Sequence, residues 1–149
     1  MKSLFSKRQI GLPSIIIFIV ITCLYCDKAS IAQPTFERAY ERWQSYLLHD
    51  YTIDQKLTCF CFNSGVPVQV SIRADTVADV AGLSDSTTIS RSSYITVDSL
   101  FAIIRNATSD SLVVRFNVRY GYPEYLDVNP QLHPVDGGYL YETSNLRIP

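Results

Sequence analysis

The sequence predicts an α+β domain with the element order α-βββ-α-βββ, in which an antiparallel sheet of about six strands carries two helices on one face. Three observations predict this fold class. Apolar residues recur with a helical period over residues 36–47 and again over residues 97–107. They recur with a period of two over six other segments, as half-buried strands require. The links between consecutive strands are short, which favours antiparallel hairpins.

Residues 1–32 have the pattern of a secretory signal peptide. Lys2, Lys7 and Arg8 give a positively charged start, and an apolar run of thirteen residues follows over 14–26. Ser30-Ile31-Ala32 then supplies the small-x-small step that precedes cleavage. The sequence therefore predicts cleavage after Ala32, a single domain over residues 33–149, and a periplasmic or extracellular location.

Two alternatives compete with a cleaved signal. A retained membrane anchor is disfavoured because a helix needs about twenty apolar residues to span a bilayer. A lipid anchor on Cys23 or Cys26 is also disfavoured, because a small residue normally precedes a lipidated cysteine. Thr22 precedes Cys23, which stays as the alternative, whereas Tyr25 before Cys26 is far too large.

The charge of residues 33–149 argues against two classes of partner. Four of the thirteen Lys and Arg residues and one of the fourteen Asp and Glu residues lie in residues 1–32. Nine basic and thirteen acidic residues remain, so the net charge is −4, and they form no basic stripe. Nucleic acid and anionic lipid surfaces are therefore poor partners.

Two amphipathic helices are expected. The first runs for about fourteen residues after Thr35 as its N-cap, and the second runs from Val97 to Asn106 after Thr96 as its N-cap. Asp98 in the first turn of the second helix suits the helix dipole. The aromatic stripe of the first helix is typical of a core and comprises Phe36, Ala39, Tyr40, Trp43 and Leu47.

Three strands are expected after each helix. In the first, Tyr51, Ile53, Leu57, Cys59 and Cys61 share the inward face, and the doubled α-βββ order hints at an internal repeat. A hydroxyl-rich loop is expected over residues 82–93. The expected strands cover residues 51–61, 66–73, 77–81, 112–120, 125–129 and 138–146.

Four motifs occur in a characteristic order: Cys59-Phe60-Cys61, Thr96-Val97-Asp98-Ser99-Leu100-Phe101, Gly121-Tyr122-Pro123 and Asp136-Gly137-Gly138-Tyr139. With these motifs the sequence resembles the DUF6174 family of exported bacterial proteins. The resemblance covers residues 36–147 and implies a compartment but no activity. The sequence departs from the family pattern at Phe62, where proline is usual, and at Arg119-Tyr120, where an acidic residue is usual.

Cys59 and Cys61 are the first candidate site, and three interpretations stay open. On a regular strand their Cα atoms lie about 6.5 Å apart, near the upper limit for a disulfide. They are buried free cysteines, or a strained and labile disulfide, or ligands of a soft metal such as Cu(I). A metal requires a third ligand, and neither His49 nor His133 has ligand spacing, so we predict no metal and no cofactor.

Tyrosines near the end of the sequence form the second candidate site. One interpretation is a contact surface for a peptide or a glycan, because tyrosine is enriched at interfaces. The other is cross-strand packing within the sheet. The residues concerned are Tyr120, Tyr122, Tyr125, Tyr139 and Tyr141.

The sequence contains no motif of an acyl-transfer, zinc-protease or phosphate-binding site, so no catalytic residue is predicted. We therefore expect a non-enzymatic exported module that binds a protein, peptide or envelope component through the open face of its sheet. The alternative is a thiol-redox or copper-handling protein that uses Cys59 and Cys61. A small hydrolase is a third and weaker hypothesis.

The signal sequence gives a first prediction. We expect the protein exported by a bacterial host to begin at Gln33, as measured by its intact mass. Ala32→Leu should block cleavage because the peptidase accepts small residues there, whereas Ala29→Leu, three residues earlier, should not. A mature chain that begins with a lipidated Cys23 would contradict this prediction.

Overall fold

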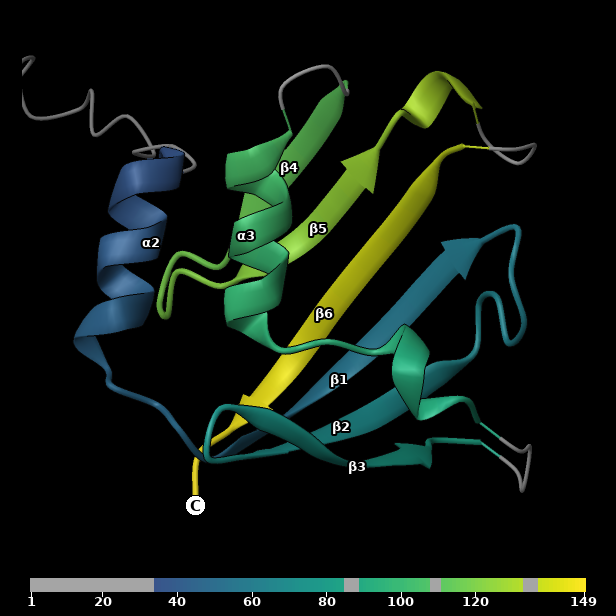
Figure 1. Ribbon diagram of the computed structural model, residues 1–149. Helices are drawn as coiled ribbons and strands as arrows, with labels where there is room; N and C mark the ends of the chain where they lie inside the picture. Colours follow the sequence, from purple (N-terminus) through teal and green to yellow (C-terminus); the bar gives the residue numbers. More distant parts are fainter. Residues whose placement is uncertain (1–33, 85–88, 108–110, 133–136) are drawn as a thin grey trace, which may run out of the picture. The chain divides into compact units, whose positions relative to one another are not determined.

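The computed structural model describes residues 34–84, 89–107, 111–132 and 137–149; the predicted signal peptide with Cys23, and His133, lie outside them. Within these ranges the protein has two α-helices and one six-stranded sheet, which confirms the α+β fold class (Figure 1). Two short 3-10 turns cover Arg91–Ser93 and Pro130–Leu132. The elements are α2 (Phe36–Ser45), β1 (Tyr51–Cys59), β2 (Pro67–Arg73), β3 (Thr76–Gly82), α3 (Val97–Asn106), β4 (Leu112–Phe116), β5 (Pro123–Val128) and β6 (Tyr139–Arg147).

The sheet is antiparallel throughout and has the order β3-β2-β1-β6-β5-β4. Hairpins join β1 to β2, β2 to β3 and β4 to β5, and β1 pairs with β6 in the middle of the sheet (Figure 1). The strand that follows α2 is therefore central, whereas the strand that follows α3 lies at an edge. Because these positions are not equivalent, the two α-βββ halves are not an internal repeat.

The core lies between the sheet and the two helices, which share one side of the sheet in Figure 1. Ile53 lies opposite Val70, and Leu57 lies opposite Tyr141, so the inward side chains of neighbouring strands form continuous rows. Burial of each large apolar side chain stabilises the fold by about 1.5–3 kcal/mol. From the helices the buried residues are Ala39, Trp43, Val97, Leu100 and Phe101.

A buried amide on β1 holds the segment that leads into α3. Gln55 is 1% exposed; its Nε2 donates to the carbonyl oxygen of Ile95 at 2.6 Å, and its Oε1 accepts from the Ile95 amide at 3.3 Å. The Tyr51 hydroxyl accepts from the Val97 amide at 3.0 Å. The Tyr141 hydroxyl donates to the Ser93 carbonyl at 3.1 Å. Side chains of two central strands thus satisfy backbone groups that an irregular buried segment would otherwise leave unpaired.

The first helix is shorter than predicted. It ends at Ser45, and the amides of Tyr46 and Leu47 turn back to the carbonyls of Trp43 and Gln44. Leu47 has a φ of 49° and is 75% exposed, so its predicted place in the buried stripe is wrong. The predicted cap of the second helix is confirmed, because Thr96 Oγ1 accepts from the Ser99 amide at 3.1 Å.

The predicted strand over 112–120 is too long, because β4 ends at Phe116. The Asn117 side chain causes this end: its Oδ1 accepts from the amides of Arg119 and Tyr120, at 3.0 and 2.7 Å. An asparagine that bonds the backbone two and three residues ahead favours a turn over a strand. The neighbouring strand β5 accordingly begins at Pro123, two residues earlier than predicted.

The turn between β4 and β5 packs tightly against α2. Gly121 has a φ of +87°, and a Cβ built there would overlap the carbonyl oxygen of Ala39 and lie 3.1 Å from the Trp43 amide nitrogen. Tyr122 then enters the core, with its ring 6.5 Å from the Trp43 ring. The Gly-Tyr-Pro turn therefore requires glycine for conformation and for space.

Gly121→Ala should lower the free energy of unfolding by about 3 kcal/mol, because it combines an unfavourable φ with a backbone overlap. Gly65→Ala is the matched control: Gly65 has a φ of +77° but no atom within 4 Å of a built Cβ, so only the conformational cost of about 1 kcal/mol applies. Urea denaturation measures both. Equal losses in the two variants would show that the approach to α2 is unimportant.

Candidate functional site

A shallow trough of about 470 Å³ crosses the sheet and carries polar side chains of its open face, the one away from the helices. Asp54 and Lys56 on β1 and Glu142 on β6 alternate with core residues, so they point away from the core. Pro67 and Leu83 add apolar surface. The lining comprises Asp54, Gln55, Lys56, Pro67, Leu83, Arg115, Glu124, Glu142, Thr143, Ser144 and Asn145.

Contacts with neighbouring side chains fix the charged groups of this trough in place. Lys56 forms an ion pair with Glu142 on the neighbouring strand. The guanidinium of Arg115 lies over the Tyr125 ring, 4.6 Å from its centroid, and the Tyr125 hydroxyl donates to Asp127 Oδ2 at 3.0 Å. The trough therefore presents both signs of charge in a fixed order, so it suits a ligand that carries both signs.

Asp54 is the most constrained charge of the trough, with 8% of the residue exposed. Burial on its own raises the pKa of this carboxyl. The hydrogen bonds from Arg147, at 3.0 and 3.3 Å, and from Asn145 Nδ2, at 2.8 Å, favour the charged form more strongly, and the pKa lies below its usual value. Asp54 is therefore a fixed negative charge on the open face at neutral pH.

Cys59 and Cys61 form a disulfide at the tip of the β1–β2 hairpin, with Cα atoms 5.2 Å apart. The distance is shorter than a regular strand allows because β1 ends at Cys59, so the prediction that Cys61 continues the strand is wrong. Cys61 is exposed and Cys59 is half-buried, so the interpretation as two buried free cysteines is also wrong. The Cys59 amide donates to Ser64 Oγ at 3.0 Å, and the Gly65 amide donates to the Leu57 carbonyl at 2.7 Å, which closes the tip.

The tip presents two phenylalanines to solvent. Phe60 is 85% exposed and Phe62 is 83% exposed. A hollow of about 390 Å³ lies among Phe60, Phe62, Ser64 and the disulfide. It shares Cys59 with an apolar recess of about 300 Å³ that extends beneath α3. The recess is lined by Leu57, Cys59, Ile95, Ile103, Tyr139 and Tyr141.

The five candidate tyrosines do not form one surface. Tyr122 and Tyr141 belong to the core, where burial raises the pKa of each to about 12. Tyr139 packs edge-on against Tyr141 on the helix side, with ring centroids 6.0 Å apart. Tyr125 is on the open face, and Tyr120 packs on Tyr46 of the segment after α2, with centroids 5.2 Å apart. Packing within the fold therefore accounts for most of this group.

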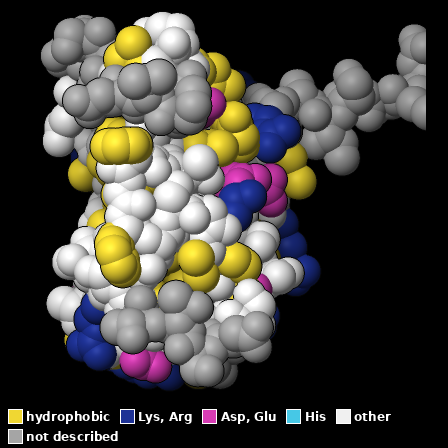
Figure 2. Space-filling view, turned by 90° about the vertical axis from the view of Figure 1, so that its right-hand side faces the viewer, with side chains coloured by type: hydrophobic (Ala, Val, Ile, Leu, Met, Phe, Trp, Pro, Cys, Tyr) yellow, Lys and Arg dark blue, Asp and Glu magenta, His cyan; other side chains and the backbone are white. Residues whose placement is uncertain are grey.

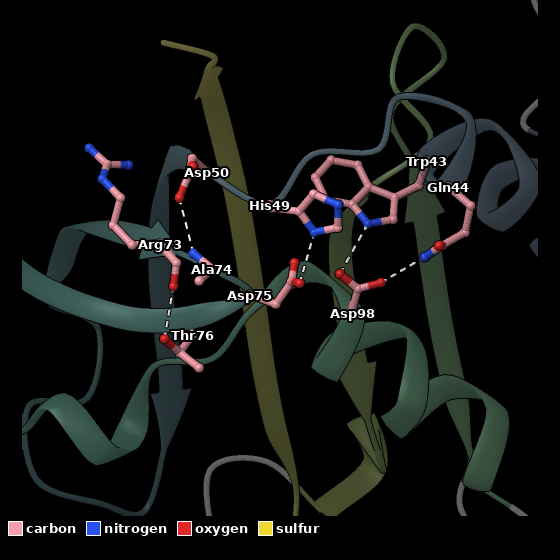
Figure 3. A network of polar contacts seen from close by, with 9 residues as sticks. All are labelled: Trp43, Gln44, His49, Asp50, Arg73, Ala74, Asp75, Thr76 and Asp98. Carbon is pink, nitrogen blue, oxygen red and sulfur yellow. Dashed lines mark hydrogen bonds and ion pairs between the residues drawn. The ribbon is translucent and has the colours of Figure 1, made fainter.

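A second polar cluster joins the end of α2 to the β2–β3 turn and the start of α3 (Figure 3). His49 Nδ1 lies 2.8 Å from Asp75 Oδ2, and Asp98 accepts from Trp43 Nε1 at 3.4 Å and from Gln44 Nε2 at 2.8 Å. These residues border a hollow of about 210 Å³. Because the cluster lies at the start of β1, His49 is far from the disulfide at the other end of that strand. Across the described ranges, no three His, Cys, Asp or Glu side chains are grouped as metal ligands.

The family model "Family of unknown function (DUF6174)" matches residues 35–148, nearly the whole described domain. The chain belongs to the DUF6174 family. A search of curated proteins and a search of solved structures found no match.

The match places the disulfide tip, the Gly-Tyr-Pro turn and the trough inside the DUF6174 domain. Sequence reasoning found the cysteines but missed Asp54 and Gln55. One sequence feature could have identified Gln55: it is a polar residue at a position of the alternating strand where an inward, apolar residue is expected. Nothing in the sequence indicated that Arg147, more than ninety residues from Asp54, would bind it. No helix among the described residues of the domain is long and apolar enough to cross a membrane.

Asp54 should make the stability of this DUF6174 domain depend on pH. Because its pKa is lower in the folded than in the unfolded state, its contribution is complete above the usual Asp value of about 3.9 and is lost as the pH falls through the folded value. Asp54→Asn should therefore reduce the free energy of unfolding by about 1.5 kcal/mol at pH 7 and by much less in strong acid.

The matched control is Asp79→Asn on β3, whose carboxylate lies 3.8 Å from Arg91 in an exposed pair. Such a pair contributes at most about 0.5 kcal/mol, so this variant should match the wild type. Denaturant unfolding over a pH series measures both variants. A loss for Asp54→Asn that does not change with pH would contradict the assignment.

Proposed function

We propose that this DUF6174 domain is an exported, non-enzymatic binding module whose ligand lies in the trough on the open face of the sheet. The single observation that supports the proposal most is the trough itself. It is more than twice the volume of the hollow beside Trp43, at about 470 against about 210 Å³. Its side chains come from several strands of one rigid sheet, which holds them ready for a ligand.

The charges of the trough favour an extended peptide that carries both acidic and basic side chains. Lys56 and Arg115 alternate with Asp54, Glu124 and Glu142 in the lining, and Arg147 pairs with Asp54, so a polyanion or a polycation would meet repulsion as well as attraction. A sugar ring stacks best on a free aromatic face, whereas the guanidinium of Arg115 covers the Tyr125 ring. A mixed-charge peptide is the ligand class that meets both conditions.

The disulfide is better suited to holding the tip of the β1–β2 hairpin in one conformation than to thiol exchange. Reactive thiols normally lie near cationic groups, which stabilise the thiolate. No charged residue occurs between Leu57 and Ile72, and the recess beside Cys59 is lined by uncharged residues. We therefore favour binding over thiol exchange as the function of the domain.

Panning of a random displayed-peptide library on the purified protein tests the proposal. We expect enriched peptides to contain acidic and basic residues and to bind more weakly as salt increases. Arg115→Ala should weaken their Kd by about tenfold, because it removes a positive charge from the lining of the trough.

Arg38→Ala is the matched control, since Arg38 is an exposed arginine on α2, outside the trough. It should leave the Kd unchanged. Enrichment of no peptide, or peptides that bind the Arg115 and Arg38 variants equally well, would rule out the trough as the ligand site.

A further inference from the structure

We propose that two copies of this chain associate through the disulfide tip, with Phe60 and Phe62 of each copy packed into the apolar recess of the other. Phe60 and Phe62 are the two most exposed of the large hydrophobic residues described, and Leu47 follows at 75%. Both rings lie at one hairpin tip, where they line the same hollow beside the disulfide, and exposed apolar side chains gathered in one place mark contact sites. The inference does not depend on the trough.

The tip is held in one conformation before any partner arrives. The disulfide joins its two sides, Ser64 Oγ accepts from the Cys59 amide, and the Tyr94 hydroxyl donates to the Val66 carbonyl at 3.2 Å. A tip that is already held in one conformation loses little conformational entropy on binding. More of the free energy gained by burying the exposed rings therefore contributes to affinity.

The recess is apolar, as a binding site for the exposed phenylalanine rings must be. It is formed by aliphatic and aromatic side chains of β1, β6 and α3, including Leu57, Ile103 and Tyr139. A further hollow of about 320 Å³ continues past Ile103 along α3. Figure 2 looks onto this end of the sheet and shows separate hydrophobic side chains among backbone and uncharged side chains, with Lys, Arg, Asp and Glu side chains at the right and at the bottom of the view.

Charge argues for a protein rather than a bilayer as the occupant. The tip has no basic residue to attract anionic headgroups, and residues 33–149 carry a net charge of −4. An uncharged patch does allow two negatively charged copies to meet there. The absence of charged residues between Leu57 and Ile72 means that no charge repulsion arises within the tip itself.

The arrangement of the disulfide tip and the recess favours a second copy over an unrelated partner. Both features include Cys59, so they are adjacent on the surface. A twofold axis near Cys59 brings each pair of phenylalanines to the recess of the other copy, which is the self-complementary contact that a symmetric dimer needs. Because the contact involves few side chains of each copy, the dimer should be weak and reversible.

Sedimentation velocity of the full protein over a range of micromolar concentrations tests the proposal. We expect a reversible monomer–dimer equilibrium. Phe60→Ser with Phe62→Ser, and separately Ile103→Arg, should each raise the dimer Kd at least about tenfold. Leu47→Ser, at an exposed leucine outside the tip, is the control and should leave the Kd unchanged.

Mixing distinguishes the proposed contact from a general loss of solubility or folding. The double-serine variant keeps its recess and lacks the rings, whereas Ile103→Arg keeps the rings and lacks the recess. A mixture restores one of the two contacts, so a mixed dimer should form more readily than either variant alone. A wild type that stays monomeric, or a mixture with no gain, overturns the proposal. Flotation of the wild type with neutral phosphatidylcholine vesicles, lost in the double-serine variant, would assign the tip to lipid instead.

Discussion

The period-two register of β1 is the constraint on which the rest of this structure depends. Its inward side chains, Tyr51 and Gln55, hydrogen-bond the segment that leads into α3. Its outward side chains, Asp54 and Lys56, supply charges to the open face. A shift of one residue would exchange the two sets and leave a carboxylate in the core, so the register is strongly fixed. One strand thereby positions the helix, the trough and the disulfide tip.

The apolar tip and the polar trough are different surfaces because of this register. β1 contributes to the trough through alternate residues and to the tip through its end at Cys59. A ligand in the trough therefore need not cover Phe60 and Phe62. The ligand proposed for the trough and the second copy proposed for the tip would contact different side chains, so neither contact excludes the other.

The regular elements could be predicted from the sequence because each buries one face and so leaves a periodic pattern. Both helices and all six strands were found, and the chain order gave the antiparallel hairpins. The errors occurred where a side chain bonds its own backbone or where a covalent bond bends the strand. Asn117 ends β4 with its side-chain oxygen, and the disulfide draws Cys61 out of line with Leu57.

The candidate site was harder to predict than the fold. The two cysteines are only two residues apart, so the pair could be identified from the sequence. The partners of Asp54, in contrast, are brought to it only by the β1–β6 pairing, which no local pattern encodes. The tyrosines are close in sequence but do not lie on one face of the sheet. The Gly121 turn places Tyr122 in the core, whereas the alternation of side chains along β5 places Tyr125 on the open face.

The place of β6 has a consequence for how this protein reaches its native state. β6 follows all the other strands in the sequence, yet it lies between β1 and β5. Until it is available, β1–β3 and β4–β5 are separate hairpin units with open inner edges. The two units can join into one sheet only after residue 147 has been synthesised, because β6 supplies the edge that each of them pairs with.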